Sequence, residues 1–319
     1  MTLDTPLYRW LPLSLARPLS TVSHLQPSQI YYRLKGQVFR LRVNIVGEAS
    51  HLALHERAQD WWPNPAVDPA NREHWQKLAG WKMNNLSPAD MVNEGRFTFL
   101  NQTMELGMPP RWDFSFTSKQ TRDPALWHFH LHYFHWLWHL IARKQHRPVV
   151  DAILDWTKKN HFGAPGCFTG AWSPYTISIR LPNWMAAYWV LHNEMTPPKK
   201  DLFIESLLMQ THFLAQHLEW EHRGNHLLEN LRCLLMVTCF LEGDRKHHIH
   251  RKAQLLTRKQ LWEQFLPGGL HFERSPMYHC LLTDHLLDLL AVLPRDVPLE
   301  KDIQRVLAKA ITTAEYLKN

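Results

Sequence analysis

The sequence predicts a mainly α-helical fold, and three observations support this prediction. Glycine is scarce, with 12 residues in a chain of 319. Apolar residues make up 45% of the chain and recur in long stretches with the spacing of a helix face. From Pro124 onward, short breaks rich in proline, glycine and polar residues separate these stretches. Consecutive helices with short connections predict antiparallel hairpins, which can pack as a ring, a solenoid or a bundle.

Residues 1–110 are expected to form a mixed helical and loop segment that packs on the remainder. The first helix follows a start signal, Pro27-Ser28. A later stretch, rich in proline and tryptophan, predicts a loop. The residues around position 100 have the pattern of two short strands and predict a hairpin. In order, the expected elements are a helix over Gln29–Val43, a loop over Trp61–Pro69, a helix over Asn71–Met83 and a hairpin over Phe97–Leu106.

Residues 111–319 are expected to form a helical domain. Pro182 falls just inside one predicted helix, and we place it in the first turn, where proline is tolerated. The predicted helices are Ala125–Lys144, Val149–Lys158, Ser178–His192, Lys199–Leu218, His226–Glu242, His247–Phe265, Pro276–Val292 and Leu299–Leu317.

The chain is basic, with a formal net charge of +7 from 36 Lys and Arg against 29 Asp and Glu. A basic surface attracts polyanions, and nucleic acid, acidic polysaccharide and anionic membrane all fit this charge. The basic residues are scattered, so an ordinary solvated surface is an equal alternative. Since no zinc-finger or RNA-binding motif is present, no nucleic-acid partner is expected. No apolar stretch reaches the roughly 18 residues of a membrane span, so none is expected.

The cysteines and the first residues bear on the compartment. Cys167, Cys233, Cys239 and Cys280 form no CxxC pair, which favours free thiols and a reducing compartment. The N-terminus has no basic start followed by an apolar run, so no secretory signal is expected. We therefore expect a cytoplasmic protein, with the periplasm as the alternative.

Two expected helix starts carry polar residues that could do chemistry. Asn225 and His226 follow Gly224, and asparagine is a favoured helix cap, so a capped helix with a nearby histidine is the simplest explanation. Asn230 fits a buried polar residue that bonds a neighbouring loop.

The second helix start lies in the segment Glu273–His279. Ser275 is the expected cap and Pro276 the first helical residue. Tyr278 then lies in the first turn, near the positive end of the helix dipole and near Arg274. Such a tyrosine could take or give a proton. The alternative is an Arg–Glu pair and an aromatic residue at a helix cap.

A third segment mixes aromatic residues with planar hydrogen-bond donors. A sugar-binding cleft needs aromatic faces for pyranose rings and planar donors for carboxylates. Arg180 is expected to supply a bidentate clamp, whereas the alternative is a packed helix with Arg180 in a salt bridge. The residues are Trp172, Tyr175, Arg180, Asn183 and Trp184.

The histidines between Trp127 and Trp136 point around a helix and lack a Cys, Asp or Glu partner at ligand spacing. We expect no metal site and no cofactor.

Taken in order, these segments resemble the heparinase II/III family of polysaccharide lyases, which in turn resemble some alginate lyases. The resemblance covers most of the chain, and Gln29–Arg33 is similar to the family's N-terminal helix. The resemblance to this family implies an incomplete α/α toroid followed by a β-sandwich. No strand-rich second domain is visible here, so we expect a toroid over 111–319, truncated at its C-terminal end. The matching segments are Leu126–Phe134, Trp172–Tyr175, Arg180 with Asn183 and Trp184, Gly224–Asn230, and Glu273–His279.

The resemblance implies β-elimination on a uronic-acid-containing acidic polysaccharide. Removal of the C5 proton leaves charge on the adjacent carboxylate, which must be neutralised while the leaving oxygen gains a proton. By resemblance, Asn225 holds the carboxylate with help from His226, and Tyr278 transfers the proton. The residues expected to bind substrate are Trp172, Tyr175, Arg180, Asn183, Trp184, Asn230, Glu273, Arg274 and His279.

Two other functions compete with the lyase. One is a noncatalytic module for acidic-glycan binding or polysaccharide assembly, because a missing β-sandwich would remove a catalytic group. The other is a helical scaffold whose aromatic residues are all core. The sequence leaves the polysaccharide, its linkage, endo or exo action, and the oligomeric state open.

Overall fold

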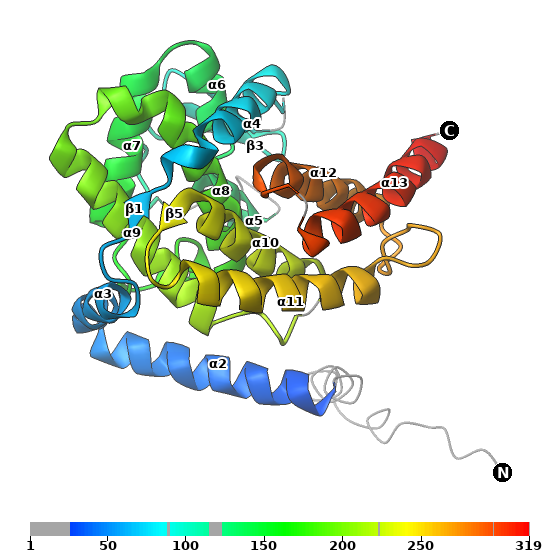
Figure 1. Cartoon of the computed structure of the whole chain (residues 1–319). Helices are drawn as coiled ribbons and strands as arrows, with labels where there is room; N and C mark the ends of the chain where they lie inside the picture. The colour runs from blue at the N-terminus through cyan, green and yellow to red at the C-terminus, as the bar shows by residue number, and fades with distance from the viewer. Residues whose placement is uncertain (1–25, 88–89, 115–122, 223, 296, 319) are drawn as a thin grey trace, which may run out of the picture.

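A computed structural model describes residues 26–87, 90–114, 123–222, 224–295 and 297–318. The described chain is mainly helical (Figure 1), which confirms the predicted fold class. The closure of the helices into a toroid and the boundary near residue 110 stay predictions. Residues 1–25, from which the lack of a secretory signal was predicted, lie outside the described residues. No described helix combines the length and apolar character that a bilayer span requires.

The helices predicted from Pro124 onward are present, and most of their ends differ by only a few residues. One predicted helix, Ala125–Lys144, is in fact two, because Phe134 adopts a left-handed conformation with φ of 63°. Its buried ring stacks on Trp136 and meets the edge of Trp184, so packing outweighs helix continuity. The helices are α5 Pro124–Tyr133, α6 Leu137–Ala142, α7 His146–Lys159, α8 Pro174–Leu191, α9 Pro197–Gln216, α10 Gly224–Phe240, α11 Lys246–Gln264, α12 Pro276–Val292 and α13 Pro298–Lys318, with short 3-10 turns η3 Cys167–Thr169 and η4 His192–Glu194.

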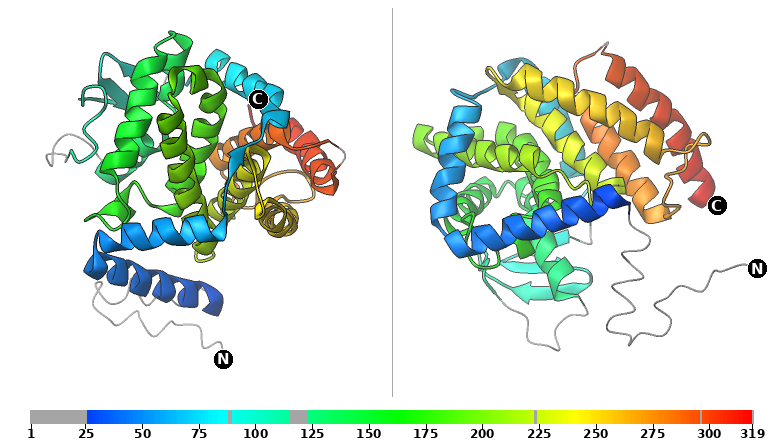
Figure 2. Two further views of the ribbon diagram at one scale, coloured as in Figure 1. Left: turned by 60° about the vertical axis from the view of Figure 1, so that its left-hand side comes forward. Right: turned by 90° about the horizontal axis from the view of Figure 1, so that it is seen from below.

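Helices α8 and α10 form the centre of the core. Nearly every residue of each is buried, and they pack against each other. Around them lie α4, α5, α9, α11 and α12, as Figures 1 and 2 show. The placement of Pro182 in a first turn is wrong, because α8 begins at Pro174 and Pro182 lies in its interior. Proline there cannot donate to the Ser178 carbonyl, and the surrounding packing keeps the helix intact.

The N-terminal segment is more helical than predicted. Its helices are α2 Pro27–Val46, α3 Ala49–Trp61 and α4 Arg72–Asn84, with a 3-10 turn η2 Pro69–Asn71. The two predicted helices are confirmed as α2 and α4. The sequence pattern does not predict α3, because only Leu54 and Ala58 of its side chains are buried. Helix α3 packs on α9, and α4 packs on α8 and α12.

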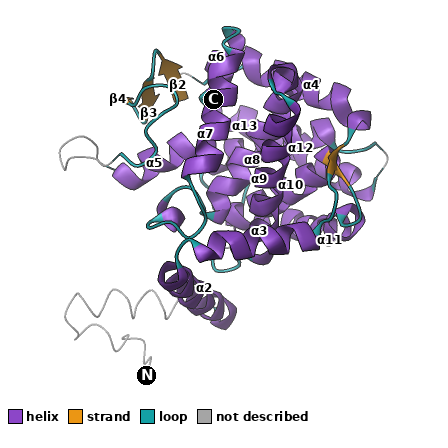
Figure 3. Cartoon of the chain, turned by 90° about the vertical axis from the view of Figure 1, so that its left-hand side faces the viewer, coloured by secondary structure: helices purple, strands orange, loops and turns teal. Residues whose placement is uncertain are grey.

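Two small sheets complete the described fold (Figure 3). Strand β1, Ala66–Val67, pairs antiparallel with β5, Leu241–Glu242, and so ties the predicted loop to the end of α10. The predicted hairpin is confirmed as two strands of an antiparallel three-stranded sheet, from which Phe97 and Phe99 pack on Trp136 and Trp127. Its strands, in spatial order, are β2 Asp90–Asn93, β3 Arg96–Phe99 and β4 Gln102–Glu105.

Candidate active site

The starts of α10 and α12 meet through Glu273, although Asn225 and Glu273 are 48 residues apart in sequence. Gly224 has φ of 51°, and a Cβ atom there would lie 2.4 Å from Oε1 of Glu273. The same carboxylate oxygen lies 3.5 Å from the backbone nitrogen of Asn225. Gln264 Nε2 donates to the Gly224 carbonyl at 2.7 Å, which fixes the loop further. The backbone conformation therefore favours glycine here, whereas the exposed Glu273 side chain could move aside for a Cβ atom.

Asn225 lies in the first turn of α10 rather than at its cap, because the helix begins at Gly224. No described residue hydrogen-bonds its side-chain amide, although the residue is mostly buried. Its amide oxygen and nitrogen are not among the fully buried side-chain atoms, so water or a bound molecule can reach them. Asn225 can therefore offer both a donor and an acceptor to a bound molecule.

His226 is held by a carboxylate from the preceding loop. Its Nδ1 lies 3.1 Å from Oε1 of Glu219, and its ring lies 4.4 Å from that of Tyr175. Burial disfavours the imidazolium, but the hydrogen bond with Glu219 and the negative charges of Glu219, Glu273 and Glu229 outweigh it and raise the pKa of His226. The imidazole thus holds its proton more readily than a free histidine.

Asn230 fixes the Glu219 side of this contact. Its Nδ2 donates to Oε2 of Glu219 and to Oγ of Ser178, both at 3.0 Å, and its Oδ1 accepts from the Glu219 backbone at 2.9 Å. The expectation that Asn230 binds substrate is corrected, because it is fully buried and these partners use its donors. Its role is to position Glu219, and through it His226.

Tyr175 lies in the first turn of α8, and its ring centroid is 4.4 Å from that of His226 and 6.1 Å from that of Tyr133. Burial and the negative charge of Glu229 raise the pKa of Tyr175 well above its usual value of 10. Its hydroxyl therefore stays protonated and can donate a hydrogen bond.

The start of α12 follows the sequence prediction closely. The Ser275 hydroxyl accepts from the Tyr278 backbone at 3.4 Å, Pro276 begins the helix, and Tyr278 is partly exposed in the first turn. Glu273 and Arg274 are exposed. The expectation that His279 binds substrate is corrected, because His279 is fully buried and bonds the His271 amide and the Ala310 carbonyl.

The aromatic and arginine residues predicted for a sugar cleft lie mostly in the core. Arg180 is fully buried, its guanidinium donates to Gln210 and to the His132 and Ala171 carbonyls, and it lies 4.0 Å from the centre of the Trp156 ring. Both of its predicted roles, the carboxylate clamp and the salt bridge, are therefore wrong. These bonds use four of its five N–H donors, the side chain is closed off from solvent, and none of these partners is a carboxylate.

The neighbours of Arg180 need the same correction. Trp172 is buried and donates to the Asn160 carbonyl, and Trp184 is buried between aromatic rings. Asn183 accepts from Trp138 and donates to the Tyr133 carbonyl. All three are structural, so only Tyr175 of that predicted set lies beside His226.

A buried ion cluster lies beneath the site and was not predicted as functional. Oε2 of Glu229 lies 2.8 Å from Nη2 of Arg232, and Oε1 lies 2.7 Å from Nδ1 of His285. Burial opposes the Glu229 charge, but Arg232 and His285 outweigh it and lower the pKa of Glu229 to about 2. Glu229 therefore supplies the permanent negative charge felt by Tyr175 and His226. Glu229 follows His226 by about one helical turn, and this spacing could have indicated that Glu229 belongs to the site. Glu219 lies in a loop, where no sequence pattern indicates a role.

A basic, aromatic cavity of about 260 Å³ adjoins this site. Trp220 and Glu221 line it, while their neighbours Glu219 and His222 contact His226. Three cations also line it: Lys35 and Arg40 from α2, and Lys252 from α11. Within the described residues, no carboxylate forms an ion pair with any of these three.

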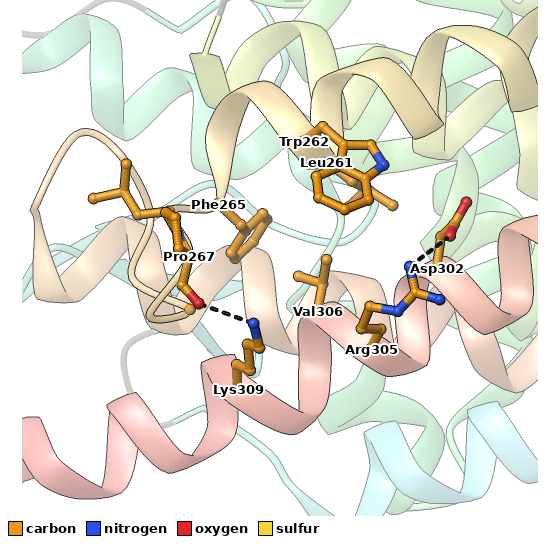
Figure 4. Close-up of a pocket in the computed structure, with 10 residues that line it drawn as sticks. Leu261, Trp262, Phe265, Pro267, Asp302, Arg305, Val306 and Lys309 are labelled. Carbon is orange, nitrogen blue, oxygen red and sulfur yellow. Dashed lines mark hydrogen bonds and ion pairs between the residues drawn. The ribbon is translucent and has the colours of Figure 1, made fainter.

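A second cavity, of about 210 Å³, lies between α11 and α13 (Figure 4). Its walls are mainly apolar, with Trp262 and Phe265 facing Val306. Its charged residues are engaged locally, since Lys309 bonds the Pro267 carbonyl and Arg305 approaches Asp302. It contains none of the predicted site residues.

The histidines of α5 take structural partners. His128 Nε2 bonds the Trp112 carbonyl, and Trp156 donates to Nδ1 of His132. Within the described ranges, no three His, Cys, Asp or Glu side chains are grouped as metal ligands.

Comparison with known proteins places the chain in a family. Residues 139–314 match the family model for the heparinase II/III N-terminus. A heparin-sulfate lyase from Pedobacter heparinus is 26% identical over 172 residues, which are 53% of this chain and 26% of that relative.

Solved structures share the fold. The crystal structure of a heparan sulfate lyase from Pedobacter heparinus matches 84% of this chain and 43% of its own, with 18% identity and a TM-score of 0.55. The crystal structure of heparinase III matches 91% of this chain and 45% of its own, with 14% identity and a TM-score of 0.57. This chain thus spans less than half the length of these proteins. Because the family model matches more than half of the chain, the chain belongs to the heparinase II/III family.

Proposed function

We propose that this chain carries the carboxylate-binding and proton-transfer groups of a polysaccharide lyase that acts on a uronic-acid-containing polymer by β-elimination. The observation that carries the proposal is the meeting of two helix starts, α10 with Asn225 and His226, and α12 with Tyr278, through Glu273. Helix starts carry positive partial charge and favour anions. The heparin-sulfate and heparan sulfate lyases that resemble the chain support an acidic polymer as substrate.

The reaction needs three groups in defined protonation states. Asn225 supplies an unpartnered amide that can donate to the uronate carboxylate. His226, with its raised pKa, adds a positive charge that stabilises the carboxylate as C5 loses its proton. Tyr278 carries that proton between C5 and the leaving oxygen. The C5–H electron pair forms the C4–C5 double bond, the C4–O bond breaks, and the leaving oxygen gains a proton.

The basic cavity next to His226 gives the polymer a path away from the reacting uronate. Tyr32 stacks on Trp220, with ring centroids 6.1 Å apart, at the rim. Lys35, Arg40 and Lys252 are exposed cations that can bind carboxylate or sulfate groups of further sugar units. Their contribution is electrostatic, so binding should weaken as salt increases.

The test is the ultraviolet absorbance of the unsaturated uronate product. The purified chain is incubated with heparin, heparan sulfate, hyaluronan and alginate, and product is followed for the wild type and for Asn225→Ala. Product from at least one polymer, lost in Asn225→Ala, is expected. Absence of product from every polymer, for this chain and for a version extended to the length of its relatives, contradicts the lyase.

A noncatalytic acidic-glycan-binding module is the second candidate, and the unpaired cations of the cavity favour it. It predicts that heparin oligosaccharides bind by titration calorimetry while no unsaturated product forms. Replacement of Lys35 and Arg40 by alanine should then weaken binding about tenfold or more, as expected when two charge-assisted contacts are removed. Binding that does not change in this variant would remove the cavity from either function.

A further inference from the structure

Helix α2 has two apolar faces, and the described chain covers only one of them. The covered face packs on the body: Tyr32 stacks on Trp220, Phe39 lies 4.2 Å from the His217 ring by centroid distance, and Val43 is buried. Gln29 adds a hydrogen bond of 3.0 Å to the Glu221 carbonyl. These contacts fix α2 along the outer edge of the molecule (Figure 2).

The other face is a stripe of large apolar side chains exposed to solvent. Its members recur at intervals of three and four residues, which is the a and d pattern of a coiled coil. Each is more than half exposed, whereas scattered exposed apolar residues are usual and continuous stripes are not. The stripe consists of Tyr31 (60% exposed), Leu34 (58%), Val38 (67%), Leu41 (61%) and Ile45 (76%).

The residue types along the stripe indicate the partner. Val38 and Ile45 are β-branched and occupy a positions, while Leu34 and Leu41 occupy d positions. This arrangement favours two parallel strands over trimers or tetramers. A second copy of the same helix presents the same pattern in the same register, so it is the partner that the stripe fits.

The flanking residues select the orientation. Lys35 and Arg42 occupy the e positions, and Gln37 and Asn44 occupy the g positions. In a parallel pair, Gln37 of one copy lies near Arg42 of the other, which brings no like charges together. In an antiparallel pair, Lys35 of one copy would approach Arg42 of the other, and like charges repel. The charges therefore favour the parallel arrangement.

We propose that the chain forms a parallel homodimer through the α2 stripe, Tyr31, Leu34, Val38, Leu41 and Ile45. A two-heptad peptide would not pair by itself, because short isolated helices are marginal in water. Here packing on the body already holds α2 helical, so association does not have to form the helix. The contact is small, and we expect a dissociation constant on the order of micromolar, as for interfaces of limited size.

The test is sedimentation velocity on the full chain over a range of concentrations. The wild type should shift from monomer to dimer as concentration rises through the micromolar range. The variant Leu34→Glu/Leu41→Glu should stay monomeric at least tenfold above the wild-type midpoint. The control Leu255→Glu changes an equally exposed leucine on α11, 69% exposed, and should dimerise as the wild type does.

Orientation is tested by oxidative cross-linking in a Cys280→Ser background, which removes the exposed native thiol. Ile45→Cys should link to itself in a parallel dimer. An antiparallel dimer would instead link Tyr31→Cys to Ile45→Cys only in a mixture of the two variants.

Four outcomes overturn the proposal. They are a monomer at all concentrations, a dimer that survives Leu34→Glu/Leu41→Glu, a cross-link between Tyr31→Cys and Ile45→Cys in place of the Ile45→Cys self-link, and a dimer that forms only after residues 1–25 are removed. The last would assign the stripe to a contact within one chain.

Discussion

The segment at α8 and the start of α10 were both predicted to contribute to the site, but the structure gives them different roles. The segment from Trp172 to Trp184 has the aromatic rings and the arginine that a sugar cleft requires, yet Arg180 is fully buried with Gln210. The segment from Gly224 to Asn230 is less conspicuous, yet Asn225 has no described partner for its amide and His226 is partly exposed. Residue type alone can suggest a binding site. Whether the residues can bind a ligand depends on their exposure and on whether their hydrogen-bonding groups are free.

The largest effect is expected at Tyr278, on the accessible side of this comparison. Tyr278→Phe removes the proton-transfer group and should reduce product formation by about 100-fold or more, the usual contribution of a general acid or base. The melting temperature should stay unchanged, because the side chain is partly exposed. Tyr316→Phe, at a tyrosine 81% exposed, is the control and should leave both quantities unchanged. Full turnover in Tyr278→Phe would remove this residue from the mechanism.

Arg180 tests the buried side. Arg180→Met leaves Gln210 and two buried carbonyls without donors and should lower the free energy of unfolding by about 3 kcal/mol, measured by urea denaturation. Arg147→Met changes an arginine that is 85% exposed and should alter stability by less than about 0.5 kcal/mol. If folded Arg180→Met protein lost only glycan affinity, with stability intact, Arg180 would be a binding residue after all.

Asn230 belongs to both parts of this comparison. It is buried like Arg180, but it hydrogen-bonds Glu219, which contacts the accessible His226. Asn230→Asp keeps the shape but replaces the donor to Glu219 with a second carboxylate oxygen, which should cost about 1–3 kcal/mol of stability at pH 8. At pH 5 part of the loss should be recovered, since two adjacent carboxyl groups share a proton more readily. A loss of stability independent of pH would mean that repulsion from Glu219 is not its cause.

The smallest effect concerns the pair of His226 and Glu219. The folded-state pKa of His226 is raised above its usual 6.5, so the stabilisation from this pair is complete below pH 6.5 and is lost as pH rises through the raised value. His226→Asn should therefore destabilise the protein more at pH 6 than at pH 9. The difference should stay below about 1 kcal/mol, because the imidazole is 35% exposed. An equal loss of stability at both pH values would contradict the raised pKa.

Much of the secondary structure could be predicted because its signals are local. Ser275 and Pro276 start α12 where expected, and the breaks rich in proline and glycine separate the later helices. The misses have non-local causes. Phe134 breaks a predicted helix because its ring is stacked on Trp136, and α3 buries too few side chains to show a pattern. The spacing of the apolar residues in α2 can be read from the sequence. Only the structure shows which of the two apolar faces of α2 is covered.

The sequence by itself determined the helical class, the start of α12, and the residues Asn225, His226 and Tyr278 as a candidate set. Only the tertiary structure shows that Arg180 and Trp184 belong to the core. It also shows that Glu219 hydrogen-bonds His226 and that the buried carboxylate of Glu229 places a negative charge beneath the site. The physical reason is the distance along the sequence over which each effect acts. Capping and proline effects act within a few residues, whereas burial and the partner of a polar group depend on segments tens of residues away.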